Sequence, residues 1–132
     1  MSQDALHASR IGQIAITVAD VDDALGFYRD VLGLVFLFRP GPNLAFLDAG
    51  GVRVMLTTPQ GHGAVGANSI VYFVVDDLHR NFDVLVARGA GAGAERRPQL
   101  TARMPDHDLW IGFLRDPDGN LVGLMEEVRP PT

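Results

Sequence analysis

One strand and helix pattern occurs twice in this chain, and it limits the possible folds more than any other feature. Residues 13–18 alternate apolar and less apolar side chains, as a half-buried strand does, and Asp20 then offers a helix N-cap. Residues 70–75 and Asp77 repeat this order, with the same offset of 57 residues for the strand (13 to 70) and for the cap (20 to 77). Two copies of one structural unit are therefore expected.

The segments after each cap complete the unit. After Asp20 a helix is predicted to end at Gly33, and after Asp77 a helix over 78–88 is predicted to end at Gly89. The first helix is followed by three strands at 34–39, 43–48 and 52–57, and the second by a strand near 99–104 and a hairpin turning at 116–119. Both halves read as βαβββ units, so the predicted fold class is α+β.

The length of 132 residues, with 47% hydrophobic side chains, suits one compact domain. The expected boundaries are an N-terminal tail at 1–10, one domain at 11–128 and a C-terminal tail at 129–132. Within the domain we expect module 1 at about 11–58, a linker at 59–68 and module 2 at about 69–128. No apolar run reaches the ~20 residues of a membrane span and the start lacks the zones of a signal peptide, so the sequence predicts a soluble, cytoplasmic protein without a membrane partner.

Charge and composition exclude several classes of function. The formal net charge is −5 at pH 7, which argues against binding nucleic acid. All 11 basic residues are arginine and the chain has no lysine or cysteine, so lysine Schiff bases, thiol nucleophiles and cysteine zinc sites are excluded. Acid–base chemistry, a metal and plain binding remain.

Two local sequences within this repeat carry a family resemblance. With the first strand reading Gln-Ile-Ala-Ile-Thr-Val-Ala-Asp at 13–20 and the last hairpin reading Phe-Leu-Arg-Asp-Pro-Asp-Gly-Asn at 113–120, the chain resembles the vicinal oxygen chelate superfamily. This group includes glyoxalase I, bleomycin-resistance proteins and extradiol dioxygenases. The resemblance implies two tandem modules forming an open, curled mixed sheet around one cavity, with helices on the outer face and often in a homodimer.

Strand pairing predicts which residues face that cavity. A four-residue turn at 116–119 would pair Gly112 with Gly123 and Trp110 with Met125, which places all four on the cavity face. Residues that face the cavity alternate in the same way with residues that face the helices along the other strands. The predicted ligand-binding residues are Gln13, Phe46, Arg53, Met55, Ile70, Tyr72, Trp110, Gly123 and Met125.

The resemblance also implies where metal-using relatives hold their ion. Those positions here are Gln13, Met55, Ile70 and Gly123. A thioether is unsuited to a hard divalent ion, and isoleucine and glycine have no side-chain donor. The sequence therefore predicts no metal at the family position, and no cofactor.

Alternatives stay open for the candidate residues. Gln13 either binds a ligand or is satisfied by neighbouring backbone, and Arg53 either binds an anionic or carbonyl-bearing ligand or reaches the rim or Asp48. The aromatic residues either form a ligand wall or fill the core. The weak catalytic candidates are His107, which lies between two aspartates, and Asp108; a solvated loop explains them as well.

Two functions from different classes follow. The first is a glyoxalase-like or bleomycin-resistance-like protein that binds a small organic molecule without a metal. The second is an isomerase or lyase acting on a small carbonyl compound, in which Gln13 or Arg53 stabilises an oxyanion and His107 or Asp108 moves a proton. If the protein only binds, Trp110→Ala is expected to weaken binding.

Overall fold

The structure is a computed structural model that describes residues 8, 10–59, 64–90 and 94–131. Most of the predicted N-terminal tail, positions 60–63 of the predicted linker and Thr132 lie outside the described residues.

Module 1 forms one four-stranded sheet with one helical segment. The N-cap prediction at Asp20 is confirmed, since its side chain accepts a hydrogen bond from the Asp23 backbone N–H at 3.0 Å. The strands lie in the order β1-β4-β3-β2, with β1 parallel to β4 and the other pairs antiparallel. The elements are β1 (Gln13–Thr17), α1 (Val21–Leu25), the π-helical η2 (Gly26–Val31), β2 (Val35–Gly41), β3 (Leu44–Ala49) and β4 (Val52–Thr57).

Module 2 repeats this topology. Its sheet has the order β5-β8-β7-β6, with β5 parallel to β8. The elements are β5 (Val71–Val74), α2 (Leu78–Leu85), η3 (Val86–Ala90), β6 (Ala94–Arg103), β7 (Asp108–Arg115) and β8 (Leu121–Val128). The predicted strand at 99–104 is therefore part of a longer strand that begins at Ala94.

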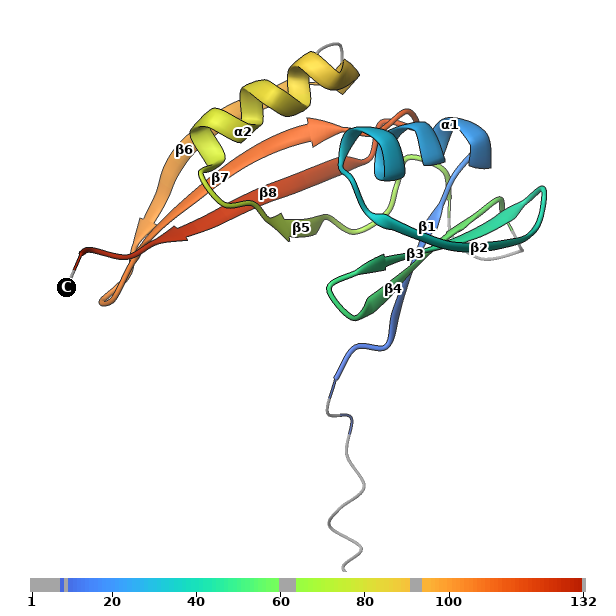
Figure 1. Cartoon of the computed structure of the whole chain (residues 1–132), viewed down its shortest axis with the longest axis horizontal. Helices are drawn as coiled ribbons and strands as arrows, with labels where there is room; N and C mark the ends of the chain where they lie inside the picture. The colour runs from blue at the N-terminus through green and yellow to red at the C-terminus, as the bar shows by residue number, and fades with distance from the viewer. Residues whose placement is uncertain (1–7, 9, 60–63, 91–93, 132) are drawn as a thin grey trace, which may run out of the picture.

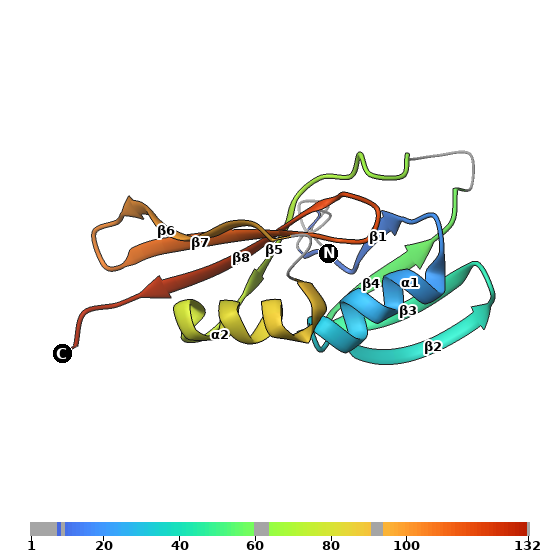
Figure 2. The same cartoon turned by 90° about the horizontal axis from the view of Figure 1, so that it is seen from above.

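The modules lie side by side along the long axis of the molecule, and both helices cover the same side (Figure 1). Viewed from above, α1 and α2 follow each other along one side while the sheets extend in opposite directions (Figure 2). The two open sheets share no strand pairing among the described residues. The α+β class with two tandem βαβββ modules is confirmed.

The helices pack on one face of each sheet, and this face holds the core. In module 1 the buried residues include Ile16, Leu47, Val54 and Leu56, which contribute alternate positions of their strands. In module 2 the core residues on the hairpin strands are Leu114, Val122 and Leu124. We call the opposite face of each sheet its inner face.

A buried polar network joins the two modules. The Tyr28 hydroxyl of η2 donates to Asp116 Oδ2 at 2.8 Å, and Asn120 Nδ2 donates to the same oxygen at 2.8 Å. Asn68 connects Asn120 with Thr17 of β1 through its side-chain amide. Hydrogen bonds from this network therefore fix the last hairpin against the first module.

The predicted register of that hairpin was wrong by one residue. Asp116 and Asn120 pair through their backbones, and the loop between them ends at Gly119, whose φ is +86°. Arg115 pairs with Leu121, so the chain between these two paired residues is one residue longer than the predicted turn, and it includes a left-handed glycine. Consequently Gly112 pairs with Leu124, Phe113 with Gly123 and Trp110 with Glu126.

This shift moves one strand of the hairpin to the opposite face. Trp110, Gly112 and Leu114 lie on the helix-covered face, whereas Ile111 and Phe113 lie on the inner face with Gly123 and Met125. Placing Trp110 in the cavity was therefore wrong, because one extra loop residue reverses the alternation of the whole strand.

Candidate functional site

Four predicted site residues share the inner face of module 1. Gln13 pairs with Arg53 across β1 and β4, and Phe46 pairs with Met55 across β3 and β4. The Gln13 side-chain amide lies 3.8 Å from the Met55 sulfur. The alternation of these strands was predicted correctly, and Arg53 pairs with Asp48 on the neighbouring strand β3.

Arg53 and the aromatic rings give this face its chemistry. The Arg53 guanidinium lies 5.5 Å from the centroid of the Phe46 ring, and that ring stacks on Phe38 at 4.7 Å. Asp48 instead accepts from the Gly51 backbone N–H at 3.2 Å. Among the described residues, no carboxylate lies within ion-pair distance of Arg53. The exposed guanidinium can therefore donate hydrogen bonds to an anionic or carbonyl-bearing ligand.

The inner face of module 2 is built around Tyr72. This residue pairs with Gly123 across β5 and β8, and its ring lies edge-on to Phe113 at 6.0 Å between centroids. Met125 pairs with Val74 on the same face, and Ile70, 40% exposed, lies just before β5. Gly123, one of the implied metal positions, therefore lies directly against the Tyr72 ring.

The residues at the implied metal position do not fit a metal ion. A Cβ added to Gly123 would lie 2.3 Å from Tyr72 Cδ2, so the Tyr72 ring occupies the space that a carboxylate side chain would need. The remaining side chains at the position are an amide, a thioether and an aliphatic group, which form no set of hard donors. Within the described ranges, no group of three His, Cys, Asp or Glu residues could hold a metal ion.

Trp110 belongs to the contact between the second sheet and its helix. Its ring meets His79 of α2 edge-on at 4.6 Å, and it packs against the hydrophobic core. A role in packing α2 onto β7 follows, since the side chain lies on the face opposite Tyr72 and Met125.

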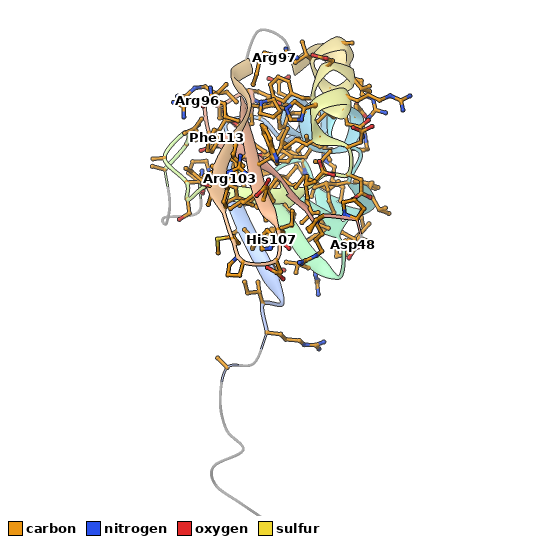
Figure 3. All side chains as sticks on the ribbon, turned by 90° about the vertical axis from the view of Figure 1, so that its left-hand side faces the viewer. Asp48, Arg96, Arg97, Arg103, His107 and Phe113 are labelled. Carbon is orange, nitrogen blue, oxygen red and sulfur yellow. The ribbon has the colours of Figure 1, made fainter. Side chains whose placement is uncertain are left out.

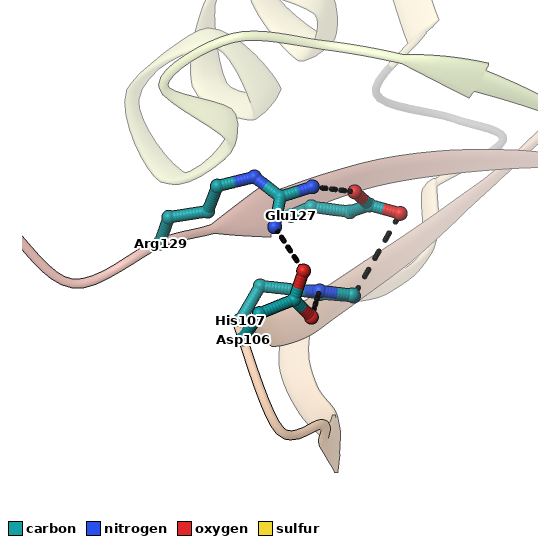
Figure 4. Close-up of polar contacts among 4 residues, drawn as sticks. All are labelled: Asp106, His107, Glu127 and Arg129. Atoms are coloured by element: carbon teal, nitrogen blue, oxygen red, sulfur yellow. Dashed lines mark hydrogen bonds and ion pairs between the residues drawn. The ribbon is translucent and has the colours of Figure 1, made fainter.

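The acid–base candidates lie at the far end of β7 and β8 (Figure 4). His107 Nδ1 is 2.8 Å from Asp106 Oδ1 and its Nε2 is 3.7 Å from Glu127 Oε2. Arg129 binds both carboxylates, at 2.7 Å to Asp106 and 2.9 Å to Glu127. The hydrogen bond from His107 and then that from Arg129 lower the pKa of Asp106. Asp108 forms a separate ion pair with Arg103 at 3.5 Å.

This arrangement holds His107 between two carboxylates at one end of β7 and β8. Figure 3 shows His107 near one end of the second sheet, with Phe113 and Arg96 toward the other. The structure therefore does not bring His107 together with Gln13 or Arg53 in one described pocket.

Arg96 was missed by the sequence reasoning. Arg96 pairs with Phe113 across β6 and β7, while Arg97 turns to the helix side, pairs with Asp83 and lies 5.2 Å from the Phe82 ring centroid. The Arg96 and Arg97 side chains thus point to opposite faces of the sheet, as neighbouring residues of a strand do. The signal was concealed by Pro98 and by register shifts in β6.

None of the helices within the described ranges has the length and apolar character needed to span a membrane.

The geometry can be compared with known proteins. Residues 10–124 match the family model described as Glyoxalase/Bleomycin resistance protein/Dioxygenase superfamily. A probable lactoylglutathione lyase of Vibrio cholerae is 30% identical, over 89% of this chain and 90% of the relative, and one of Vibrio parahaemolyticus is 28% identical over the same shares. The crystal structure of a lactoylglutathione lyase from Agrobacterium tumefaciens has a TM-score of 0.68 and 29% identity, covering 91% of this chain and 95% of that chain.

Proposed function

Because the chain belongs to the Glyoxalase/Bleomycin resistance protein/Dioxygenase superfamily, we propose that it binds a small organic anion or carbonyl compound on its inner faces without a metal ion. We also propose that the protein acts as a homodimer in the cytoplasm. The observation that carries the proposal is Arg53, an exposed guanidinium beside a stacked phenylalanine pair and without a carboxylate partner among the described residues.

The chemistry of this face favours a planar, acidic ligand. The Phe38 and Phe46 rings offer an aromatic surface, and the Arg53 guanidinium offers paired donors in a plane that matches a carboxylate. Gln13, which pairs with Arg53 across β1 and β4, adds an amide that can donate to a carbonyl oxygen beside the guanidinium. A cationic ligand is disfavoured by Arg53.

Calorimetric titration with benzoate and naphthoate as probes tests this proposal. We expect Arg53→Gln to weaken binding at least tenfold, since a charge-assisted hydrogen bond contributes about 1.5–3 kcal/mol. Arg80→Gln is the matched control, because Arg80 is exposed on α2, away from the inner faces. This substitution removes the same positive charge as Arg53→Gln. Equal affinity for all three proteins would disprove a role of Arg53 in binding.

The relatives named as probable lactoylglutathione lyases favour a second candidate, an isomerase or lyase acting on a carbonyl compound. In that case lactoylglutathione should be formed or consumed when zinc or nickel is added. We expect no turnover with the native chain, because the Tyr72 ring fills the space beside Gly123. Metal-dependent turnover that Gln13→Ala removes would establish the enzyme and contradict the metal-free proposal.

A further inference from the structure

An apolar groove lies where the two modules meet, and it reaches the inner face of module 2 at Tyr72 and Val74. It consists of two hollows of about 400 Å³ and about 290 Å³, which share Leu34, Phe73 and Val74 as lining residues. The two hollows adjoin at these shared residues, and we call them together the junction groove. Its lining residues come from β5, from the β3–β4 turn and from the C-terminal part of α2 with η3.

The walls of the junction groove are almost uniformly apolar. Ile14, Val52 and Val71 line the larger hollow, and Val84 and Leu85 line the smaller one. Tyr72 and Asn81 supply the only uncharged polar side chains of the described lining. The groove therefore suits an aliphatic chain, and its size falls in the range of about 300–1,000 Å³ that small-molecule sites occupy.

One end of the groove carries a positive charge. Arg88 is the only charged residue in the described lining of either hollow. Its Nη1 donates to the Val31 carbonyl at 3.1 Å, which leaves further guanidinium donors. No carboxylate within the described part of the chain is in ion-pair distance of Arg88. An apolar groove with one cationic end is complementary to an aliphatic carboxylate.

We propose that the junction groove binds a medium-chain aliphatic carboxylate, with the chain along Phe73 and Val74 and the carboxylate at Arg88. Pairing with a strand from another chain is less suited to this place, since β5 has only four residues and short edge strands resist such pairing. This site uses Arg88 rather than Arg53, so it does not depend on the function proposed above.

Calorimetry with hexanoate, octanoate and decanoate below their micelle concentrations tests the proposal. Affinity should rise about fourfold per methylene, because burying one methylene contributes about 0.8 kcal/mol. Arg88→Gln should weaken decanoate binding about tenfold and leave decanol binding unchanged, since only the carboxylate needs the guanidinium.

A charge reversal within the groove provides the second arm. Val74 is 74% exposed, so Val74→Glu is expected to fold and to abolish decanoate binding by repulsion. Val128→Glu is the matched control, because Val128 is 43% exposed at the end of β8 and lines neither hollow. Circular dichroism should show the same fold for both variants, and sedimentation velocity records the association state of each.

Three results would overturn the proposal. Affinity independent of chain length would show that the groove does not hold the chain, and equal loss in Val128→Glu would show an unspecific effect of charge. If decanoate fails to bind the native protein while Val74→Glu converts a dimer into monomers, the groove is an interface between two copies of the chain.

Discussion

At the scale of single residues, Tyr28 and Asp116 contribute more to the stability of the fold than the exposed candidate site residues do. Tyr28 is 1% exposed and Asp116 is 5% exposed, and their hydrogen bond joins η2 of module 1 to the last hairpin of module 2. A buried carboxylate that loses a donor keeps its desolvation penalty, so the hydroxyl group contributes strongly to stability.

Tyr28→Phe is expected to lower the free energy of unfolding by about 1–3 kcal/mol. Chemical denaturation at neutral pH measures this loss. Tyr72→Phe is the matched control, because the Tyr72 side chain is 43% exposed on the inner face and its hydroxyl group is not part of the buried network. An equal, small effect of both substitutions would show that the network does not stabilise the protein.

The same pair predicts a dependence on pH. Burial first, and then the charge of Asp116, raise the pKa of Tyr28 in the folded protein, whereas a tyrosine in the unfolded chain titrates near pH ~10. The stability from the neutral hydroxyl is therefore complete below about pH 10 and decreases above it, by about 1.4 kcal/mol per pH unit. The difference between native protein and Tyr28→Phe should shrink over this range.

Sequence reasoning finds residue roles that depend on near neighbours. Asp20 was predicted as an N-cap and Gly33 as a helix end, and both are confirmed because their partners lie within a few positions. The bond between Tyr28 and Asp116 spans 88 positions. No local pattern contains it, because the fold alone brings these residues together.

At the scale of elements, strand β8 determines how α2 begins. Asp77 was predicted as the N-cap, but its φ is +50° and its side chain makes no capping bond. Glu126 of β8 takes this role, since its two carboxylate oxygens accept from the Asp77 and Leu78 backbone N–H groups, each at 2.9 Å. A negative charge is favourable there, because the N-terminus of a helix carries a partial positive charge.

Glu126→Gln should therefore lower the free energy of unfolding by about 1–2 kcal/mol. Glutamine keeps one of the two acceptor oxygens at the start of the helix and lacks the negative charge. Urea denaturation followed by circular dichroism measures the change. Glu127→Gln is the control with the same change of charge, and its exposed ion pair with Arg129 should contribute less than about 1 kcal/mol. A larger loss in Glu127→Gln would contradict the capping role of Glu126.

The hairpin shows why elements are easier to predict than their faces. Both strands and the turn were predicted in the right order, yet a single additional loop residue placed Trp110 on the helix side. The inner face of module 1 was predicted better, because its parity rests on the alternation of β1 and β4 and not on a turn type. Trp110 is consequently a packing residue of α2 and β7.

At the scale of the whole molecule, the inner faces are open. Phe38 is 46% exposed beside Phe46, and Tyr72 is 43% exposed beside Gly123. The strands β1 and β5 are edge strands of separate sheets, without strand partners on their outer sides among the described residues. We infer that each module offers half of a site and that a second copy of the chain covers one inner face with the other.

We therefore expect sedimentation velocity to show a dimer at micromolar concentration, as the exposed apolar residues of the inner faces favour burial. Phe38→Glu should shift the protein to a monomer, because it places a carboxylate in the exposed phenylalanine pair of the covered face. It should also weaken the binding of naphthoate, since the aromatic stack beside Arg53 is lost.

Val128→Glu serves again as the control, because Val128 lies at the end of β8, outside the stack of Phe38 and Phe46. A native protein that stays monomeric would contradict the dimer. A dimer that survives Phe38→Glu would place the interface elsewhere on the surface. If Phe38→Glu loses naphthoate binding while the dimer persists, Phe38 belongs to the ligand site and not to the dimer interface. The inner face of a single module would then be sufficient to hold the ligand.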